Sequence, residues 1–525
     1  MNPQPATMDD WPQILACFAL GFFICWGLIG VILRRAERGL IQQRARDFHH
    51  GHKVPIPRLG GVALAAAFGI VAMIIALCTT LPSSGLATLC VIVTSSLALF
   101  MLGFCDDLRP LSARFKLLAQ VAVASAVYFC NIRIELFHEP FSGMDLQLGW
   151  FGYVATVLWL VSLTNLINLI DGIDGLAGGI GLMLMLLLAN LGVTDHLDFC
   201  ALLAFGVAGA LLGFLKYNYP PARIYLGDGG AYFLGFLIGI LSIVNSNKGT
   251  VAAALIAPAF ALALPIVDVS LAILRRGARG LPVFRPDQKH IHHHLLIKLG
   301  ISRERTLLNL YTVSLLCLFL ALCVFCLQGR LLPLYTGLLF LVLLVAGHLS
   351  GFTRNWFEVG SQLGQSLRLR KETRYALTLD RWLMLEAERR GRVEDLWEDY
   401  EFVVKKLGFS RLKLTLPGGK TRVWQAEGFD LQSVPHLRAA HEISDGTVVE
   451  LTAATHAMPE ELFTLLGDLA AESWYKAAQR CRAMNGKTRP TVATDDPTDK
   501  GSAAAVIPDL AGPPPPETLV SQSYT

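Results

Sequence analysis

The chain has 525 residues, of which 53% are hydrophobic and 16% are charged, and its formal net charge is +4 at pH 7. A soluble globular protein usually carries about a quarter charged residues, so this composition excludes an ordinary soluble protein. The small net charge gives no reason to expect a nucleic-acid partner.

Apolar runs that are long enough, or nearly long enough, to cross a bilayer dominate the chain up to residue 350. A membrane-spanning helix needs about 20 predominantly apolar residues. The runs lie at 11–33, 62–81, 86–104, 114–132, 150–170, 176–193, 199–217, 229–246, 251–274, 306–327 and 331–349. They predict an all-α polytopic membrane domain over residues 1–350, with about 11 transmembrane helices.

Positive charge near the ends of the runs predicts their orientation. Arg34, Arg35 and Arg38 follow the first run, so we expect the loop after it to be cytoplasmic. The N-terminus then lies outside and the C-terminus inside. Because successive spans alternate in direction, the loops at 105–113, 171–175, 218–228 and 275–305 are also expected on the cytoplasmic side.

After residue 350 charged residues become frequent, and short elements replace the long apolar runs. The apolar spacing between 375 and 407 predicts amphipathic helices that break near Gly391. Strands are expected at 411–416, 421–426 and 447–453, with a closing helix at 459–484. We therefore expect a small cytoplasmic α+β domain of unknown role over 351–485. The Pro-rich segment 486–525 is expected to be a disordered tail.

Acidic residues gather at the ends of the predicted spans, on the side expected to be cytoplasmic. They are Asp106, Asp107, Asp171, Asp174, Asp228 and Asp287, with Asp268 inside the ninth run. A single Asp at a helix end can serve only as a cap. Several carboxylates converging on one face repel one another unless a cation neutralises them. Oxygen ligands of this kind suit Mg²⁺, which binds through one or two carboxylates plus substrate phosphates, and Mn²⁺ is the alternative ion.

A run of histidines and several cations lie near the same loops. His290, His292 and His293 belong to the segment HIHHH, which no Cys accompanies and whose spacing matches no common zinc site. We expect one or two of these imidazoles to bind or polarise a diphosphate instead, and the others to be structural. The basic residues that can neutralise phosphates are Lys53, Arg58, Lys116 and Lys289. For Lys53, Arg58 and Lys289 the competing explanation is that they only set the membrane orientation. This explanation is weaker for Lys116, which follows the Asp106–Asp107 pair by nine residues.

Five segments, in this order, resemble the polyprenyl-phosphate N-acetylhexosamine-1-phosphate transferase family, also called glycosyltransferase family 4. They are KVPIPRLGG (53–61), GFCDDLRPLSARFKLLAQ (103–120), NLINLIDGIDGLAGG (165–179), YLGDGGAYFLG (225–235) and RPDQKHIHHHLL (285–296). The residues of these segments are most similar to the branch that uses UDP-N-acetylglucosamine in O-antigen, enterobacterial common antigen or teichoic acid synthesis. The pair Gly229 and Gly230 departs from the family, which more often has a Ser or Thr nearby.

The resemblance implies a reaction in which a lipid phosphate oxygen attacks the sugar-proximal phosphorus of a UDP-sugar. UMP leaves, a polyprenyl-diphosphate-linked sugar remains, and cell-surface glycan assembly begins. The implied setting is the bacterial inner membrane, with a cytoplasmic active site. Polyprenyl phosphate and the UDP-sugar are the implied small partners. A homodimer, and docking of downstream glycosyltransferases on the C-terminal domain, are further hypotheses.

The resemblance also implies roles for the candidate residues. Asp228 is expected to be the chief metal ligand, assisted by Asp171 or Asp174. Asp106 is expected to deprotonate or orient the lipid phosphate, with Asp107 beside it. Asn168 and the 171–175 loop are expected to hold nucleotide or metal. Lys116 is expected to pair with phosphate, and His292 and His293 with the diphosphate. Lys53, Arg58 and His290 are expected to bind substrate.

Three other functions compete with this interpretation. Acidic residues and Gly-broken helices at membrane depth also fit a secondary transporter, although the sequence contains no evident inverted repeat. A sensor or scaffold built on 350–484 would need no acidic loops in its membrane anchor. Among enzymes, the phospho-MurNAc-pentapeptide transferase of peptidoglycan synthesis is the alternative, and a change of donor in one assay separates the two.

Overall fold

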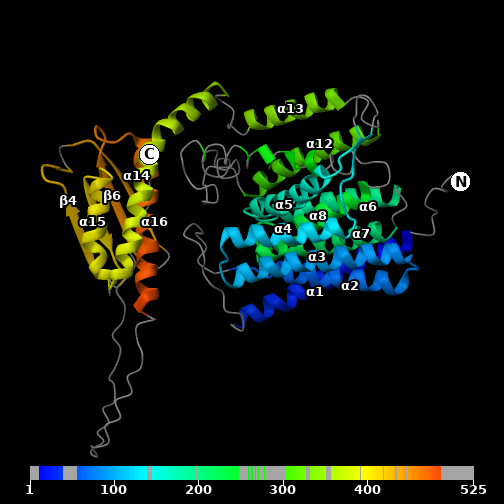
Figure 1. Cartoon of the computed structure of the whole chain (residues 1–525). Helices are drawn as coiled ribbons and strands as arrows, with labels where there is room; N and C mark the ends of the chain where they lie inside the picture. The colour runs from blue at the N-terminus through cyan, green and yellow to red at the C-terminus, as the bar shows by residue number, and fades with distance from the viewer. Residues whose placement is uncertain are drawn as a thin grey trace, which may run out of the picture.

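The structure is a computed structural model in which a helical bundle precedes a small α+β unit (Figure 1). The described residues are 11–38, 56–138, 145–194, 198–246, 303–326, 332–349, 356–390, 392–417, 419–431, 434–443 and 446–485, with a few isolated positions between 258 and 277. The bundle contains two short paired strands, β1 (Leu136–His138) and β2 (Asp145–Gln147), which the sequence pattern did not predict. Its helices are α1 (Trp11–Glu37), α2 (Gly60–Cys78), α3 (Ser83–Leu108), α4 (Ala113–Phe129), α5 (Phe151–Ile170), α6 (Leu176–Thr194), α7 (Asp198–Asn218), α8 (Gly227–Ser246), α12 (Arg303–Cys326) and α13 (Leu332–Leu349).

Among the described residues, seven helices are long and apolar enough to cross a membrane: α1, α2, α3, α5, α6, α7 and α8. Helix α4 has only 17 residues. The predicted runs coincide with helices except at 251–274, of which only isolated positions belong to the described residues. The chain is thus mostly helical with several membrane-spanning candidates, and the count of about eleven spans is not confirmed.

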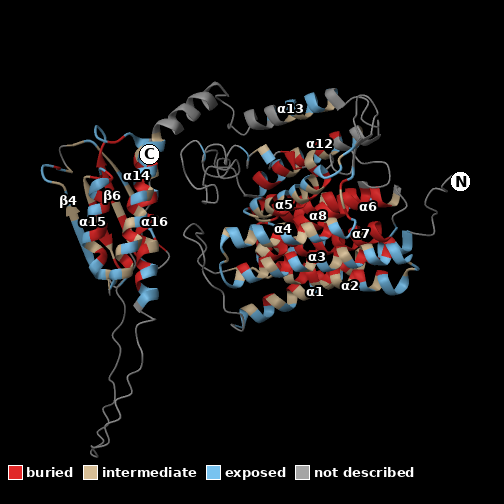
Figure 2. Cartoon of the chain, viewed as in Figure 1, coloured by how far each residue is buried: buried red, intermediate tan, exposed pale blue. Residues whose placement is uncertain are grey.

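Helix α8 lies at the centre of the bundle. Of its most apolar window, 94% is buried, whereas the corresponding share is 28% for α1 and α3. Figure 2 shows the same contrast, with buried residues around α8 and exposed ones on the outer helices. The outward side chains of those helices include Phe23, Leu77 and Leu158, which suit a hydrocarbon surrounding better than water. Helix α8 is therefore enclosed by the other helices of the bundle.

The α+β unit is built on one four-stranded antiparallel sheet in the order β4-β3-β6-β5. Its elements are α14 (Trp356–Arg389), the 3-10 turn Val393–Leu396, α15 (Trp397–Lys406), β3 (Arg411–Thr415), β4 (Thr421–Gln425), β5 (His436–Glu442), β6 (Val448–Ala454) and α16 (Glu460–Asn485). The predicted break near Gly391 and three of the strands are confirmed, because α14 ends at Arg389 and β3, β4 and β6 form as expected. Strand β5 was missed, since its residues are mostly polar or half-exposed and show no apolar alternation.

This unit has a hydrophobic core of its own. Leu412 and Leu414 of β3 and Val449 and Leu451 of β6 point to the side where the helices lie, and all are fully buried. Trp474 of α16 belongs to the same core. The boundaries predicted for the domains stay a prediction, and the predicted tail at 486–525 lies outside the described residues.

Candidate active site

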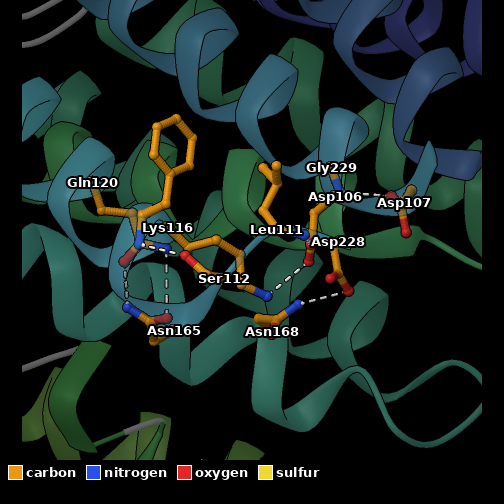
Figure 3. A network of polar contacts seen from close by, with 11 residues as sticks. Asp106, Asp107, Leu111, Ser112, Lys116, Gln120, Asn165, Asn168, Asp228 and Gly229 are labelled. Carbon is orange, nitrogen blue, oxygen red and sulfur yellow. Dashed lines mark hydrogen bonds and ion pairs between the residues drawn. The ribbon is translucent and has the colours of Figure 1, made fainter. Parts of the chain in front are cut away.

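The C-terminal ends of α3 and α5 and the N-terminal ends of α4 and α8 meet at one end of the bundle (Figure 3). The sequence predicted that the loops at 105–113, 171–175 and 218–228 share one side, and hydrogen bonds between these loops confirm it. That this side is cytoplasmic stays a prediction.

Asp106 and Lys116 form an ion pair across the turn between α3 and α4. Lys116 Nζ donates to Asp106 Oδ2 at 2.7 Å, and the backbone N–H of Leu111 donates to Oδ1 at 2.7 Å. Helix α3 ends at Leu108, because Pro110 disfavours the helical conformation of the residue before it. Ser112 caps the first turn of α4 with its hydroxyl. The Asp106 side chain is almost fully buried, so its carboxylate is held in one place with both oxygens engaged.

Asp228, in the first turn of α8, faces this pair. Asn168 of α5 donates from Nδ2 to Asp228 Oδ1 at 3.2 Å. The carboxyls of Asp228 and Asp106 are close enough to hydrogen-bond to each other. Two such carboxyls repel each other when both are ionised, unless they share a proton or a cation neutralises them. The pair is therefore an electrostatic site for a positively charged group.

Asp107, the next residue of α3, closes the start of α8. Its Oδ2 atom accepts a hydrogen bond of 3.0 Å from the backbone N–H of Gly229. The N–H groups in the first turn of a helix have no partner within the helix, and they favour a negative charge. Gly227 stands at φ +78°, where a side chain would be strained and would also approach Asp107.

Asp171 caps the C-terminal end of α5 and lies near the other carboxyls. Loss of solvent around its carboxyl raises the pKa of Asp171 well above that of an ordinary aspartate, and the nearby charges of Asp228 and Asp107 raise it further. Arg58 is close enough to Asp171 and Asp107 to lower the pKa of Asp171 in part. A positive charge beside these carboxyls relieves the repulsion.

Arg58 is held beside the site by backbone pairing. The N–H of Tyr225 donates to the carbonyl of Pro57 at 2.9 Å, and the N–H of Gly60 donates to the carbonyl of Tyr225 at 2.9 Å. The segment that carries Arg58 therefore runs along the segment that leads into α8. A cation and the acidic first turn of α8 are thus placed side by side.

The remaining predicted residues lie elsewhere or outside the described residues. Asp174 is turned to the loop before α8, where its Oδ2 accepts a hydrogen bond of 3.1 Å from the N–H of Ala222. Of the two candidates for the assisting carboxylate, Asp171 is the one near Asp228. The residues that lie outside the described part of the chain are Lys53, His290, His292, His293, Asp268, Asp287 and Lys289.

Two amides below the ion pair were missed by the sequence analysis. Asn165 Nδ2 donates to Gln120 Oε1 at 2.7 Å, and Gln120 Nε2 donates back to Asn165 Oδ1 at 3.5 Å. Gln120 lies one helical turn after Lys116, and Asn165 lies one turn before Asn168, so the amide pair joins α4 to α5 under the site. That spacing was the available signal. Asn218 and Tyr311 were also missed, because their contacts join segments far apart in sequence.

The donor set fits a hard divalent cation that completes its coordination with substrate. Within the described residues, no group of three or more His, Cys, Asp and Glu side chains forms a closed metal cage. Mg²⁺ does not need one, because it commonly takes one or two carboxylates and fills its other positions with water and phosphate oxygens. Asp228 and Asp171 supply carboxylates of that kind.

Known proteins share part of this sequence. The family described as "Glycosyl transferase family 4" matches residues 89–246. A "Probable undecaprenyl-phosphate N-acetylglucosaminyl 1-phosphate transferase" of Bacillus subtilis is 33% identical over 266 residues, which are 50% of this chain and 72% of the relative. A "Decaprenyl-phosphate N-acetylglucosaminephosphotransferase" of Mycobacterium leprae is 30% identical over 318 residues, 55% of this chain and 77% of the relative. A "Phospho-N-acetylmuramoyl-pentapeptide-transferase" of Listeria monocytogenes is 28% identical over 329 residues, 59% of this chain and 98% of the relative.

Proposed function

This chain belongs to glycosyl transferase family 4, and from that premise we propose that it transfers N-acetylglucosamine 1-phosphate from UDP-N-acetylglucosamine to undecaprenyl phosphate. UMP is released, and the lipid-linked sugar starts the assembly of a cell-surface glycan. Relatives named for transfer to undecaprenyl or decaprenyl phosphate support this donor and acceptor. The wider class of transferred group is an N-acetylhexosamine 1-phosphate. The proposed place is the bacterial inner membrane, with the site on the cytoplasmic side.

The observation that carries the proposal is the meeting of Asp106 and Asp228 beside Lys116 at the end of an apolar bundle. An acceptor with a hydrocarbon tail must stay in the bilayer, while its phosphate and the UDP-sugar meet at the interface. Phosphoryl transfer needs mainly positioning and neutralisation of charge. Carboxylates, a lysine and an arginine held at one helix end are suited to that task.

We propose that Asp228 is the main ligand for Mg²⁺ and that Asp171 assists it. When bound, the ion would draw electron density from the diphosphate oxygens and stabilise the charge that develops there. The nearness of Asp228 to Asp106 and of Asp171 to Asp228 supports this, because a bound cation offsets the repulsion between ionised carboxyls in addition to Lys116 and Arg58. Mn²⁺ satisfies the same requirements.

We propose that Lys116 binds the phosphate of the lipid and that Asp106 orients Lys116. A phosphate monoester has a second pKa of about 6, so near neutral pH it is largely ionised and needs orientation more than a base. Both oxygens of Asp106 are already engaged by Lys116 and Leu111. The predicted roles of Asp106 are to deprotonate or to orient the lipid phosphate, and this arrangement favours an indirect orientation of that phosphate through Lys116.

We propose that Asn168, Arg58 and the loop 171–175 hold the UMP half of the donor. Arg58 offers a planar cation suited to phosphate oxygens. Asn168 already fixes Asp228, so its amide orients the carboxylate that faces the diphosphate. The donor then lies between the loop after α5 and the first turn of α8, with its sugar-proximal phosphorus turned to the lipid phosphate.

The proposal is tested with purified protein in detergent, undecaprenyl phosphate and a panel of UDP-sugars, with UMP as the readout. We expect UMP release with UDP-N-acetylglucosamine that requires both lipid and Mg²⁺ and stops when EDTA is added. Asp228→Ala should abolish it. Asp198→Ala, in the first turn of α7 outside the carboxylate cluster, is the matched control and should keep most of it.

Two outcomes would redirect the proposal. Turnover only with UDP-MurNAc-pentapeptide would keep the reaction class and move the pathway to peptidoglycan, as the Listeria relative allows. A folded protein that releases no UMP from any donor would contradict the transferase proposal and favour the transporter.

A further inference from the structure

The peptide group of Gly175 is held from both sides. Its N–H donates to Asn218 Oδ1 at 2.8 Å, and its carbonyl accepts a hydrogen bond of 2.5 Å from the hydroxyl of Tyr311. Gly175 stands at φ +82°, which only glycine adopts without strain. The end of the 171–175 loop therefore has a backbone conformation fixed by two side chains from distant helices.

Tyr311 comes from α12, beyond the residues matched by the family, and α6 is shaped to receive it. A Cβ atom on Gly179 would overlap the Tyr311 hydroxyl, so the absence of a side chain there makes room for the ring. Leu307, one helical turn earlier in α12, is fully buried, and a Cβ atom added to Gly175 would lie 3.0 Å from its side chain. The fit between α12 and the start of α6 is thus close on both sides of the hydroxyl.

The same network reaches the segment that leads into α8. Asn218 is buried and donates from Nδ2 to the carbonyl of Ile224 at 2.8 Å. Asp174 accepts from the N–H of Ala222 at 3.1 Å. Through these bonds the loop that begins with Asp171 and the loop that ends at Asp228 are tied together, and Tyr311 anchors the tie from outside.

We infer that Tyr311 is a positioning residue for the donor half of the site: its hydroxyl fixes the Gly175 carbonyl and so holds Asp171 at its distance from Asp228. The inference rests on the proposed function for its kinetic consequence. It assigns α12, which follows the stretch matched by the family, a part in binding the UDP-sugar. The acceptor half, at Asp106 and Lys116, is not part of this network.

The test is Tyr311→Phe, which removes one hydroxyl, beside Tyr153→Phe as the matched control. Tyr153 also bonds through its hydroxyl, to Ser125 at 2.9 Å, but near the other end of α5. We expect Tyr311→Phe to raise the KM for the UDP-sugar and the half-saturating Mg²⁺ concentration by about 3- to 10-fold, the effect of one hydrogen bond. The KM for undecaprenyl phosphate should stay within about twofold of the unmodified protein, and the melting temperature should match that of Tyr153→Phe.

A second variant approaches the same contact from the other side. Gly179→Ala places a Cβ where the hydroxyl now lies, so it should displace Tyr311 and raise the same two constants. Gly69→Ala is its control, because a Cβ there meets nothing within 4 Å. If Tyr311→Phe and Tyr153→Phe have the same KM for the UDP-sugar and the same half-saturating Mg²⁺ concentration, the inference is wrong.

Amide hydrogen exchange separates this inference from the proposed function. If the unmodified protein releases no UMP from any donor, the proposed function fails, and exchange in peptides covering 171–180 still tests the tether. We expect faster exchange there in Tyr311→Phe than in Tyr153→Phe, because the loop loses one of its anchors. Equal exchange in the two variants would overturn the positioning role.

Discussion

The carboxylate of Asp107 accepts the backbone N–H of Gly229 at 3.0 Å, so the last turn of α3 closes the first turn of α8. This bond spans 122 residues of sequence and joins the two helix ends that carry Asp106 and Asp228. Asp107 thus binds the helix that carries Asp228, while the preceding residue, Asp106, binds Lys116.

Two substitutions of Asp107 separate its role as a hydrogen-bond acceptor from its negative charge. Asp107→Ala removes the acceptor and should lower stability by about 1 kcal/mol, as loss of a helix cap does. Asp107→Asn keeps an acceptor oxygen and should keep the melting temperature, while it loses the negative charge. Thermal unfolding in detergent, with UMP release measured in parallel, checks both. Equal melting temperatures for the Ala and Asn variants would contradict the capping role.

Removing Lys116 should leave Asp106 buried without its cation. Breaking a buried ion pair costs about 3–5 kcal/mol, and we expect less because Lys116 keeps 24% side-chain exposure. Lys116→Met should therefore unfold at a lower temperature than the double variant Asp106→Asn/Lys116→Met. Both should lose activity. A double variant less stable than Lys116→Met would show that the Asp106–Lys116 ion pair does not stabilise the turn between α3 and α4.

Gly103 tests how closely α3 must approach α8. A Cβ on Gly103 would overlap the backbone carbonyl of Asp228, whereas a Cβ on Gly69 meets nothing within 4 Å. Gly103→Ala should push the two helices apart and reduce UMP release at least about tenfold, since a shift of 1 Å at a site can cost more than that. Gly69→Ala should be neutral or stabilise α2 by up to about 1 kcal/mol. Full activity in Gly103→Ala would contradict the packing.

Glu450 gives the C-terminal unit a pH-dependent contribution to stability. The ammonium of Lys413, at 2.7 Å, lowers the pKa of Glu450 below its ordinary value of 4.5, and Arg438 adds to this. The contribution is present above the unfolded pKa and is lost as the pH falls through the lower folded pKa. Glu450→Gln should cost less than about 1 kcal/mol at pH 7, and the difference should vanish well below pH 4.5.

Thermal unfolding of the full chain at several pH values measures this, with Glu442→Gln on the neighbouring strand as control. The side chain of Glu442 is exposed. A Glu450 variant whose deficit in stability grows as the pH falls would contradict a lowered pKa for Glu450 in the folded protein.

The sequence predicted the helices because long apolar runs have few alternatives, and it predicted the meeting of the loops because positive charge and alternation order them. It did not predict that Asp174 accepts a hydrogen bond from the backbone N–H of Ala222. An Asp after a helix has the same sequence pattern whether it binds a metal or a backbone N–H. Helix α4 begins one residue before its predicted run, where Ser112 caps it, and ends three residues before the end of that run, because Cys130 caps its C-terminal end.

The contacts that position the site are the part that the pattern could not supply. Tyr311 and Gly175 are 136 residues apart, and a tyrosine inside an apolar helix gives no sign of its partner. Asn165 and Gln120 lie at helical spacing from Asn168 and Lys116, so their pairing was open to prediction once the helices were placed. Strand β5 pairs along β6 at the sheet edge, where a partly exposed strand needs no alternation.

The most direct test of the account follows the phosphate that is attached to the sugar. UDP-N-acetylglucosamine carrying ³²P in that phosphate is incubated with undecaprenyl phosphate, Mg²⁺ and the purified protein, and lipid and water fractions are separated. The account predicts one label in the lipid for each UMP released, because sugar and phosphate move together. Label that stays in water as UDP, with unlabelled sugar on the lipid, would mean that the sugar alone is transferred and would contradict the central claim.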